Sequence, residues 1–434
     1  MPEPTPPAAG PLGPMTRARW SLLASLYVTQ FLALGFFFIA LVVILRQEGA
    51  RLDHLSIIPL LGLVWVVKVL WAPLVDRIRF GRLGHYRGWL ILTQAGLVVS
   101  LLVVGLFDPV TDFPTVFGLC LVVAILCATQ DIAADALACR LLPPDKRGLG
   151  NGLQIGGGLL GNMIGGGGVL MLYPHIGWQG CMGVLAAGVL PPLLQLVAFR
   201  EPRLIDASGP HKDPKRDKLW AHTRRLWMVW RQPGGGRWLL LLLLYPFGLA
   251  TVYYLTTPML VDAGWSTEHI GLTLNVVGAV IGVGAALGAG WLIQRLGRKT
   301  ILIGGAVAQV AVVLAFLAPA TGHTGILAVL APLTVLFLLY SPMATILTTL
   351  MMDRVSPAHA GTDFTVQYSL YTMVATVAGV SAYQIAATLG YPGTVLLAGV
   401  VAAISALCAP LLYRPAGVAP APVTPVVPRP AETD

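Results

Sequence analysis

The 434-residue sequence contains few charged residues: Asp, Glu, Lys and Arg together make up 11% of it, whereas hydrophobic residues make up 56%. A soluble domain carries roughly 25% charged residues. A water-soluble helical protein would not contain so many nearly charge-free runs of membrane-spanning length, and an open β-sheet cannot satisfy its backbone in lipid. The low charge therefore excludes these two classes and indicates an integral membrane protein.

The sequence also lacks clustered cysteines. Its five cysteines (Cys120, Cys127, Cys139, Cys181 and Cys408) form no CxxC pair or Cys/His cluster, so free, buried thiols are expected, with no disulfide and no metal site. No nucleophile and base pair accompanies the apolar runs, so neither an enzyme nor a cofactor is expected. The opening "MPEPTPPAAGPLGPM" has no apolar core before Arg17, which predicts a retained signal anchor rather than a cleaved signal.

Twelve apolar segments are each near the ~20 residues that a helix needs to cross a ~30 Å hydrocarbon core. The sequence therefore predicts an all-α membrane protein with twelve transmembrane helices. With boundaries uncertain by a few residues, the segments cover about 20–45, 56–75, 88–107, 114–141, 148–172, 179–199, 238–261, 267–293, 300–319, 324–352, 360–388 and 391–413.

The charges behind the net charge of +9 are distributed unevenly among the loops. Basic residues follow the second, fourth and eighth spans, namely Arg77, Arg79, Arg82, Arg87, Arg140, Lys146, Arg147, Arg295, Arg298 and Lys299. The alternate loops hold Asp108, Asp112, Asp262 and Glu268, and few cations apart from Arg46 and Arg51. This asymmetry is the positive-inside pattern, which predicts that both termini are cytoplasmic. The basic balance therefore reports topology and a lipid bilayer partner, not nucleic acid.

One long polar connection divides the chain into six spans and six spans. We expect a disordered cytoplasmic N-terminus (1–19), a six-helix bundle (20–199), a cytoplasmic linker (200–237), a second six-helix bundle (238–413) and a disordered cytoplasmic C-terminus (414–434). Within the linker, "KLWAHTRRLWMVW" has the spacing of an amphipathic helix lying on the membrane surface. A regulatory domain is the alternative, which the short length of the linker disfavours.

The two halves resemble each other. "PPDKRGLGNGLQ" matches "SPAHAGTDFTVQ", which pairs Pro144 with Pro357 and Gly148 with Gly361. "APLVDRIRFGRL" and "AGWLIQRLGRKT" likewise follow the second span of each half, although Gln294 replaces Asp76. Two parallel six-helix repeats predict the major facilitator architecture of two pseudo-symmetric bundles.

Two glycine stripes mark the fifth span, and small residues at four-residue spacing let helices approach closely in lipid. Their members are Gly148, Gly152 and Gly156 on one stripe and Gly157, Gly161 and Gly165 on the other; the eighth span offers Gly278, Gly282, Gly284 and Gly288. Both stripes could form a sliding surface between the halves. Ordinary packing within one half is an equally good reading for half of these glycines.

Few charges lie deep in the predicted membrane. Lys68 and Asp131 fall at nearly the same depth, and Asp135 lies one helical turn from Asp131 on the same face. Buried carboxylates usually face a partner or a wet path and often carry protons. We expect Asp131 to carry a coupling proton, with Asp135 tuning it and Lys68 as their partner. The alternatives are a static Lys68–Asp131 bridge, with Asp135 held by Arg140, and direct substrate contact.

Asp76 is a different case, because it ends the second span beside basic residues. We expect Asp76, Arg77, Arg140 and Arg147 to form a cytoplasmic gate that locks the outward-facing state.

Several stretches resemble the AmpG-like branch of the major facilitator superfamily: "KVLWAPLVDR", "HYRGWLILTQ", "ATQDIAADALA" and "LPPDKRGLGNGLQIGGGLLGNMIGGG". That branch includes muropeptide permeases, acetyl-CoA transporters and siderophore permeases of the RhtX/FptX type. "ASLYVTQFLALGFF" and "ADALACRLLPPDKRGLGNGLQI" look most like the siderophore permeases. The resemblance implies proton-driven import of a siderophore, ferric or desferri, across the bacterial inner membrane.

In this architecture the first and fourth helices of each half line the cavity. The expected substrate-binding residues are Tyr27, Gln30, Gln130, Gln154, Tyr253, Tyr254, Gln367, Tyr368 and Tyr371. So many tyrosines favour an aromatic ligand such as a pyochelin-type chelate, although Tyr residues near span ends can instead belong to the aromatic belt. The alternative substrate is a muropeptide or another metabolite. We expect a monomer. The alternative from a different functional class is a membrane receptor or scaffold that transports nothing.

Overall fold

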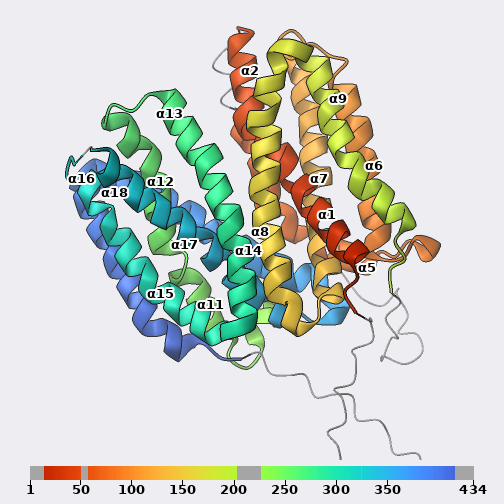
Figure 1. Ribbon diagram of the computed structural model, residues 1–434. Helices are drawn as coiled ribbons and strands as arrows, with labels where there is room; N and C mark the ends of the chain where they lie inside the picture. The colour runs from red at the N-terminus through yellow and green to blue at the C-terminus, as the bar shows by residue number, and fades with distance from the viewer. Residues whose placement is uncertain (1–13, 50–56, 203–225, 324, 416–434) are drawn as a thin grey trace, which may run out of the picture.

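The computed structural model describes residues 14–49, 57–202, 226–323 and 325–415, and these residues are almost entirely helical (Figure 1). The prediction of an all-α membrane protein is confirmed. In the first half the α-helices are α1 (Arg17–Gly35), α2 (Val42–Gln47), α4 (Leu63–Val67), α5 (Ala72–Arg77), α6 (Tyr86–Val104), α7 (Phe113–Leu141), α8 (Arg147–Met163) and α9 (Val169–Ala198). Short π and 3-10 segments join them: η1 (Phe36–Leu41), η2 (Ile58–Gly62), η3 (Lys68–Leu70), η4 (Gly81–Leu83), η5 (Pro144–Lys146) and η6 (Ile164–Gly168).

The second half contains α11 (Gly235–Leu244), α12 (Phe247–Asp262), α13 (Thr267–Gly271), α14 (Gly278–Leu296), α15 (Arg298–Ala315), α16 (Leu317–Ala320), α17 (Ile326–Asp353) and α18 (Ala360–Leu412), with η7 (Leu272–Val277) and η8 (Pro357–His359). Figure 1 shows α8 and α14 side by side where the two halves meet.

Among the described residues, nine helical stretches are long and apolar enough to cross a membrane. Two of them, Pro144–Ala198 and Pro357–Leu412, are each long enough for two spans. Both turn at a glycine with positive φ, Gly177 at 65° and Gly390 at 68°, a conformation that only glycine adopts readily. With these two stretches divided, and with the shorter Ile58–Leu70 counted, the helices correspond to the twelve predicted spans.

The second span is not the continuous helix that the sequence predicts. Its helical turns change between 3-10 and α type at Leu63, Lys68 and Ala72. Pro59 and Pro73 each lie in the first turn of a segment, where a missing N–H is tolerated, and each prevents an earlier turn from continuing. Lys68 therefore starts a 3-10 turn in the middle of the span.

The structure describes residues near several of the predicted domain ends. Residues 17–19, expected to be disordered, form the first turn of α1, which the Thr16 side chain caps by accepting from the Arg19 N–H. The second bundle starts at Gly235 in α11, three residues before its predicted start. Residues 1–13, most of the linker (203–225) and 416–434 lie outside the described residues, and so does most of the predicted surface helix.

The two glycine stripes of α8 pack against different partners. Gly148 and Gly152 face α14 across the halves: a Cβ on Gly152 would lie 2.7 Å from the Ala286 carbonyl oxygen. The second stripe instead packs within its own half, because a Cβ on Gly161 would overlap the carbonyl oxygen of Val28 on α1. Only the first stripe thus lies between the halves, and the second is ordinary close packing.

The prediction for the eighth span is wrong at two glycines. Gly284 and Gly288 are exposed, and a Cβ added to either would meet no atom within 4 Å, while Gly278 packs on Phe337 of its own half. The face that α14 presents to α8 includes Gly282 and Gly290, eight residues apart. Glycine spacing on α14 correctly indicates a closely packed helix, but the face that packs against α8 carries Gly282 and Gly290 rather than Gly284 and Gly288.

We predict that Gly161→Ala destabilises the protein by about 1–3 kcal/mol, because the added methyl group overpacks a backbone contact. Thermal unfolding of the purified protein in detergent measures this, with Gly284→Ala as the matched control on an exposed helix face. Equal melting temperatures for the two variants would contradict the packing of α1 against α8.

Candidate functional site

A buried ion pair joins two segments of the first half. Lys68 Nζ contacts Asp131 Oδ2, and the two side chains are only 2% and 1% exposed. Lys68 starts the 3-10 turn η3, and Asp131 lies on α7, so the pair comes from the broken span and its neighbour. Removing Lys68 alone would leave buried carboxyls without a counter-ion, at a cost of about 3–5 kcal/mol.

Asp135 is buried one turn further along α7 and accepts a hydrogen bond from Gln154 Nε2 of α8 at 2.7 Å. The alternative in which Arg140 holds Asp135 is not what the structure shows. Arg140 instead lies at the end of α7, where its Nη1 approaches Glu201 at 3.7 Å. Asp135 is thus a second buried carboxyl, and its direct partner is a neutral amide.

Uncharged polar side chains of α1, α6 and α7 form a polar cluster in the first half. Gln94 and Gln130 both donate to the Thr29 hydroxyl at 3.4 Å. Further polar atoms are buried without a hydrogen-bond partner in the described chain, including Tyr27 Oη, Gln30 Oε1, Gln94 Oε1, Gln130 Oε1 and Asp131 Oδ1. Buried polar groups normally bond to protein or to water. The cluster therefore offers acceptors to a water or a polar ligand beside Asp131.

Tyrosines of the second half face this pair. Lys68 Nζ lies 5.3 Å from the ring centre of Tyr368 on α18, so the cation from one half covers an aromatic face of the other. Tyr368 lies 6.0 Å from Tyr371, and Tyr253 on α12 stacks on Tyr340 of α17 at 4.8 Å. These rings, with Tyr254 beside Tyr253, form an aromatic cluster opposite the buried charges.

The predicted binding residues thus divide into two groups. Tyr27, Gln30 and Gln130 lie in the polar cluster of the first half, and Tyr253, Tyr254, Tyr368 and Tyr371 lie in the aromatic cluster. Gln154 and Gln367 are engaged elsewhere. Gln154 donates to Asp135, while Gln367 accepts from Trp238 Nε1 and donates to the Asp363 carbonyl, both at 2.7 Å. In this conformation the side-chain amides of Gln154 and Gln367 are therefore engaged in hydrogen bonds within the protein.

The two halves are joined at one end of the molecule, which we call the basic end: loops 78–85, 142–146 and 354–359, with Arg298. There Asp76 accepts from the backbone N–H groups of Gly361 and Thr362 at 2.9 and 2.7 Å, and from the Thr362 hydroxyl at 2.6 Å. A carboxylate at the start of α18 satisfies N–H groups that the helix leaves free and complements its dipole. Tyr86 also donates to Asp76, at 2.6 Å.

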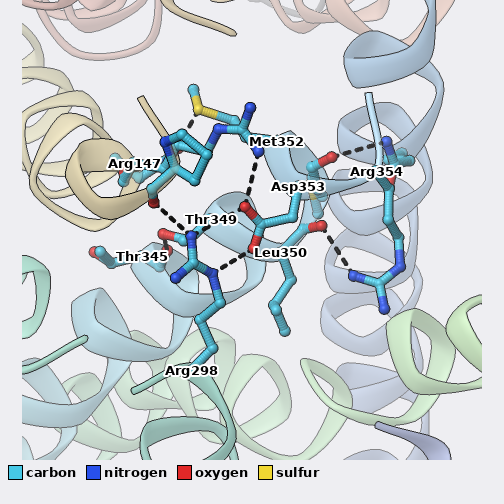
Figure 2. Close-up of polar contacts among 12 residues, drawn as sticks. Arg147, Arg298, Thr345, Thr349, Leu350, Met352, Asp353 and Arg354 are labelled. Atoms are coloured by element: carbon cyan, nitrogen blue, oxygen red, sulfur yellow. Dashed lines mark hydrogen bonds and ion pairs between the residues drawn. The ribbon is translucent and has the colours of Figure 1, made fainter. Parts of the chain in front are cut away.

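A second cross-half contact centres on Asp353, at the end of α17. Figure 2 shows its carboxylate between Arg147 and Arg298: Arg147 Nη1 donates to Oδ1 at 2.9 Å, and Arg298 contacts both oxygens. Arg298 also donates to the Pro144 carbonyl at 2.6 Å. One carboxylate of the second half thus holds an arginine from each half.

Arg140 and Arg77 complete the predicted gate residues. Arg140 Nε donates to the Pro357 carbonyl across the halves at 3.1 Å, and its guanidinium lies over the Tyr86 ring. Arg77 is the exposed last residue of α5. Asp76, Arg140 and Arg147, all predicted gate residues, therefore make cross-half contacts in this conformation.

The sequence analysis did not identify Asp353 as a residue that joins the halves, although the internal repeat points to it. The pairing of Pro144 with Pro357 also pairs Arg140 with Asp353, so the two halves place opposite charges at equivalent helix ends. Glu201 and His85 were missed as well, because loop residues carry no such periodic pattern. Among the described residues, no group of three His, Cys, Asp or Glu side chains could hold a metal ion.

Comparison with known proteins identifies the fold. The family model of the Major Facilitator Superfamily matches residues 23–383. The human organic anion transporter MFSD10 (TETRAN) has the same fold, with a TM-score of 0.70 at 15% identity over 91% of this chain and 100% of that chain. The E. coli fucose:proton symporter FucP gives a TM-score of 0.67 at 14% identity, over 91% and 98% of the two chains.

Two curated relatives are more similar in sequence. The anhydromuropeptide permease of Escherichia coli (strain K12) is 31% identical over 258 residues, which is 57% of this chain and only 50% of that protein. The putative transporter AmpG 4 of Rickettsia conorii is 22% identical over 294 residues, or 64% of this chain and 69% of its own length. The chain therefore belongs to the Major Facilitator Superfamily, as a multi-pass membrane transporter and not an enzyme, and it is similar in sequence to the AmpG permeases.

Proposed function

We propose that the protein imports a small solute by proton-coupled alternating access. The observation that carries the proposal is the charge of the buried cluster: Lys68 contributes +1 and the two carboxyls −2, which leaves −1 when all three are ionised. An unbalanced charge at membrane depth costs several kcal/mol. One proton on either carboxyl balances the cluster, which is the property that proton coupling requires.

The contacts favour Asp135 as the proton site in this conformation, a change from the preference for Asp131 that the sequence alone supports. Asp131 is already matched by the Lys68 ammonium, whereas Asp135 has only a neutral amide as its direct partner. The proton would therefore sit on Asp135 while the Lys68–Asp131 pair is closed. The static-bridge alternative assigns no proton to either residue.

We also propose an orientation. The basic loops support a cytoplasmic basic end, following the positive-inside rule, and the similarity to bacterial permeases supports the inner membrane. With that orientation, the closed basic end makes this the outward-facing state. The contacts of Asp76 and Asp353 would then have to open before a solute could enter the cytoplasm.

The solute would bind between Lys68 and the aromatic cluster, since Tyr368 touches both groups. A sugar-peptide of the anhydromuropeptide type is the first candidate, because the E. coli relative bears that name. Sugar faces stack on tyrosine rings, and Lys68 could take a carboxylate if Asp131 releases it. An aromatic siderophore is the second candidate, favoured by the number of tyrosines in the cluster.

For coupling, we predict that Asp135→Asn folds and still exchanges solute but loses proton-driven accumulation, because the cluster is then neutral without a proton. Uptake of labelled anhydromuropeptide and ferric pyochelin into proteoliposomes, with and without an imposed pH gradient, measures this. Asp108→Asn, in an exposed loop, is the control. A static bridge predicts wild-type accumulation in Asp135→Asn, so that result would contradict the proposal.

Removing the Lys68 cation should lower the stability of the protein. Lys68→Met leaves two carboxyls without a counter-ion and should lower the free energy of unfolding by about 3–5 kcal/mol. Adding Asp131→Asn and Asp135→Asn to Lys68→Met restores a neutral cluster and should recover most of that loss. Thermal unfolding in detergent distinguishes the two variants, and equal stability of both would show that charge balance does not govern this site.

For substrate choice, we predict that Tyr253→Leu lowers the apparent affinity for the transported solute about two- to tenfold, the range expected for one lost ring contact. Competition of anhydromuropeptide and ferric pyochelin for uptake in the same proteoliposomes identifies the solute. Tyr391→Leu, which removes a tyrosine bonded to Asp262 away from the cluster, is the control. Equal effects of the two substitutions would exclude the aromatic cluster as the binding surface.

For the gate, we predict that Asp353→Asn shifts the population toward an open basic end, because a carboxylate shared by two arginines becomes a neutral amide. Spin labels at the exposed residues Ile78 and Ala358, one in each half, report their separation. The control is Asp145→Asn at the same end, whose carboxylate pairs with exposed Lys146. An unchanged distance distribution in Asp353→Asn would contradict this role.

A further inference from the structure

A cavity of about 1040 Å³ lies at the basic end of the first half, away from the buried pair. Its walls are loop 79–87, the end of α9 and residues 200–202, with Arg140 beside them. Five arginines line it: Arg79, Arg82, Arg87, Arg140 and Arg200. Glu201 is the one acid among the lining residues, so the wall carries a net charge of +4.

Glu201 shows that this wall accommodates an anion. Its carboxylate accepts from the backbone N–H groups of His85, Tyr86 and Arg87 at 2.8, 3.3 and 3.0 Å, at the start of α6. Arg140 Nη1 lies 3.7 Å from the same carboxylate. One internal carboxylate thus occupies the helix N-terminus, and the exposed Arg82 and Arg200 add positive charge beside it.

The wall also has fixed geometry. Arg87 donates from Nε to the Leu196 carbonyl at 2.7 Å and from Nη2 to the Val197 carbonyl at 2.9 Å, which ties loop 79–87 to the end of α9. His85 adds no charge of its own, because burial and then the Arg140 guanidinium lower its pKa. Arg82 and Arg200 are exposed and free to turn toward a ligand.

The same cavity borders exposed apolar residues of α9. Val197 lines it and is 62% exposed, and Leu194, one turn earlier on α9, is 67% exposed. A ligand there could keep its charged group among the arginines and an apolar tail against α9. Clustered arginines at the end of a membrane helix are a typical setting for anionic headgroups.

We propose that this cavity binds a phosphate group carried by an anionic molecule, as in the headgroup of an anionic phospholipid. Arg140 belongs both to the cavity wall and to the cross-half contact with Pro357, so an anion in the cavity would act on the closed basic end through that side chain. The ligand is distinct from the transported solute, and the inference does not depend on the proposed substrate.

The test compares the full-length protein with Arg82→Gln/Arg200→Gln in nanodiscs of phosphatidylcholine with or without phosphatidylglycerol. Lipids retained after extraction are counted by native mass spectrometry. We expect the wild type to retain phosphatidylglycerol over phosphatidylcholine and the double variant to retain it about tenfold less. Arg295→Gln/Lys299→Gln removes the same charge at the same end, outside the cavity, and should change retention little.

A second arm separates lipid from soluble phosphate. Inorganic phosphate is added to the wild type in pure phosphatidylcholine nanodiscs, and the melting temperature is measured. A rise that the Arg82→Gln/Arg200→Gln variant lacks supports the phosphate site, with soluble phosphate as its source. Equal lipid retention by all three proteins, together with no effect of phosphate, would overturn the proposal. So would an equal loss of retention in the two double variants.

Discussion

The rest of the structure depends on one electrostatic constraint: two carboxyls and one ammonium are buried together in the first half. Lys68 and Asp131 form an ion pair, and Asp135 follows one turn later with a neutral partner. In water, the net charge of −1 on these three groups would cost little free energy, but at membrane depth it costs several kcal/mol. Under the proposed proton coupling, one proton on this site makes it neutral, which would let it respond to a proton gradient.

The helices that carry the buried charges also carry the cross-half contacts of the basic end. Asp131 and Arg140 are both on α7, about 14 Å apart along its axis at ~1.5 Å per residue. Tyr368 lies six residues after Thr362 on α18, whose first turn donates to the Asp76 carboxylate, and Tyr340 shares α17 with Asp353. A change of charge or ligand near Lys68 and Asp131 would therefore act on the same helices, α7, α17 and α18, that make the contacts at the basic end. The contact of α8 with α14 through small residues lets these elements approach closely without large side chains between them.

The sequence predicted what depends on composition and repetition. Hydropathy located the spans, the depth of Lys68 matched that of Asp131, and the basic helix ends pointed to Asp76, Arg140 and Arg147, which make cross-half contacts. It did not predict what depends on the rotation of a helix or the path of a loop. Gly284 has the same four-residue spacing as the packed glycines but faces outward. Gln367 has the polarity of a ligand-binding residue but bonds to Trp238. The breaks at Pro59 and Pro73 were visible in the sequence, yet only the fold shows that they place Lys68 at the start of a 3-10 turn.

The central claim is that one of two buried carboxyls holds a proton while Lys68 is paired. Infrared spectroscopy of the purified, solute-free protein tests it directly, because a protonated carboxyl has a carbonyl band that a carboxylate lacks. Spectra recorded near neutral pH should show one such band, and the band should be missing in Asp135→Asn. A wild type with no such band near neutral pH, or a band that persists in both Asp131→Asn and Asp135→Asn, would contradict the account.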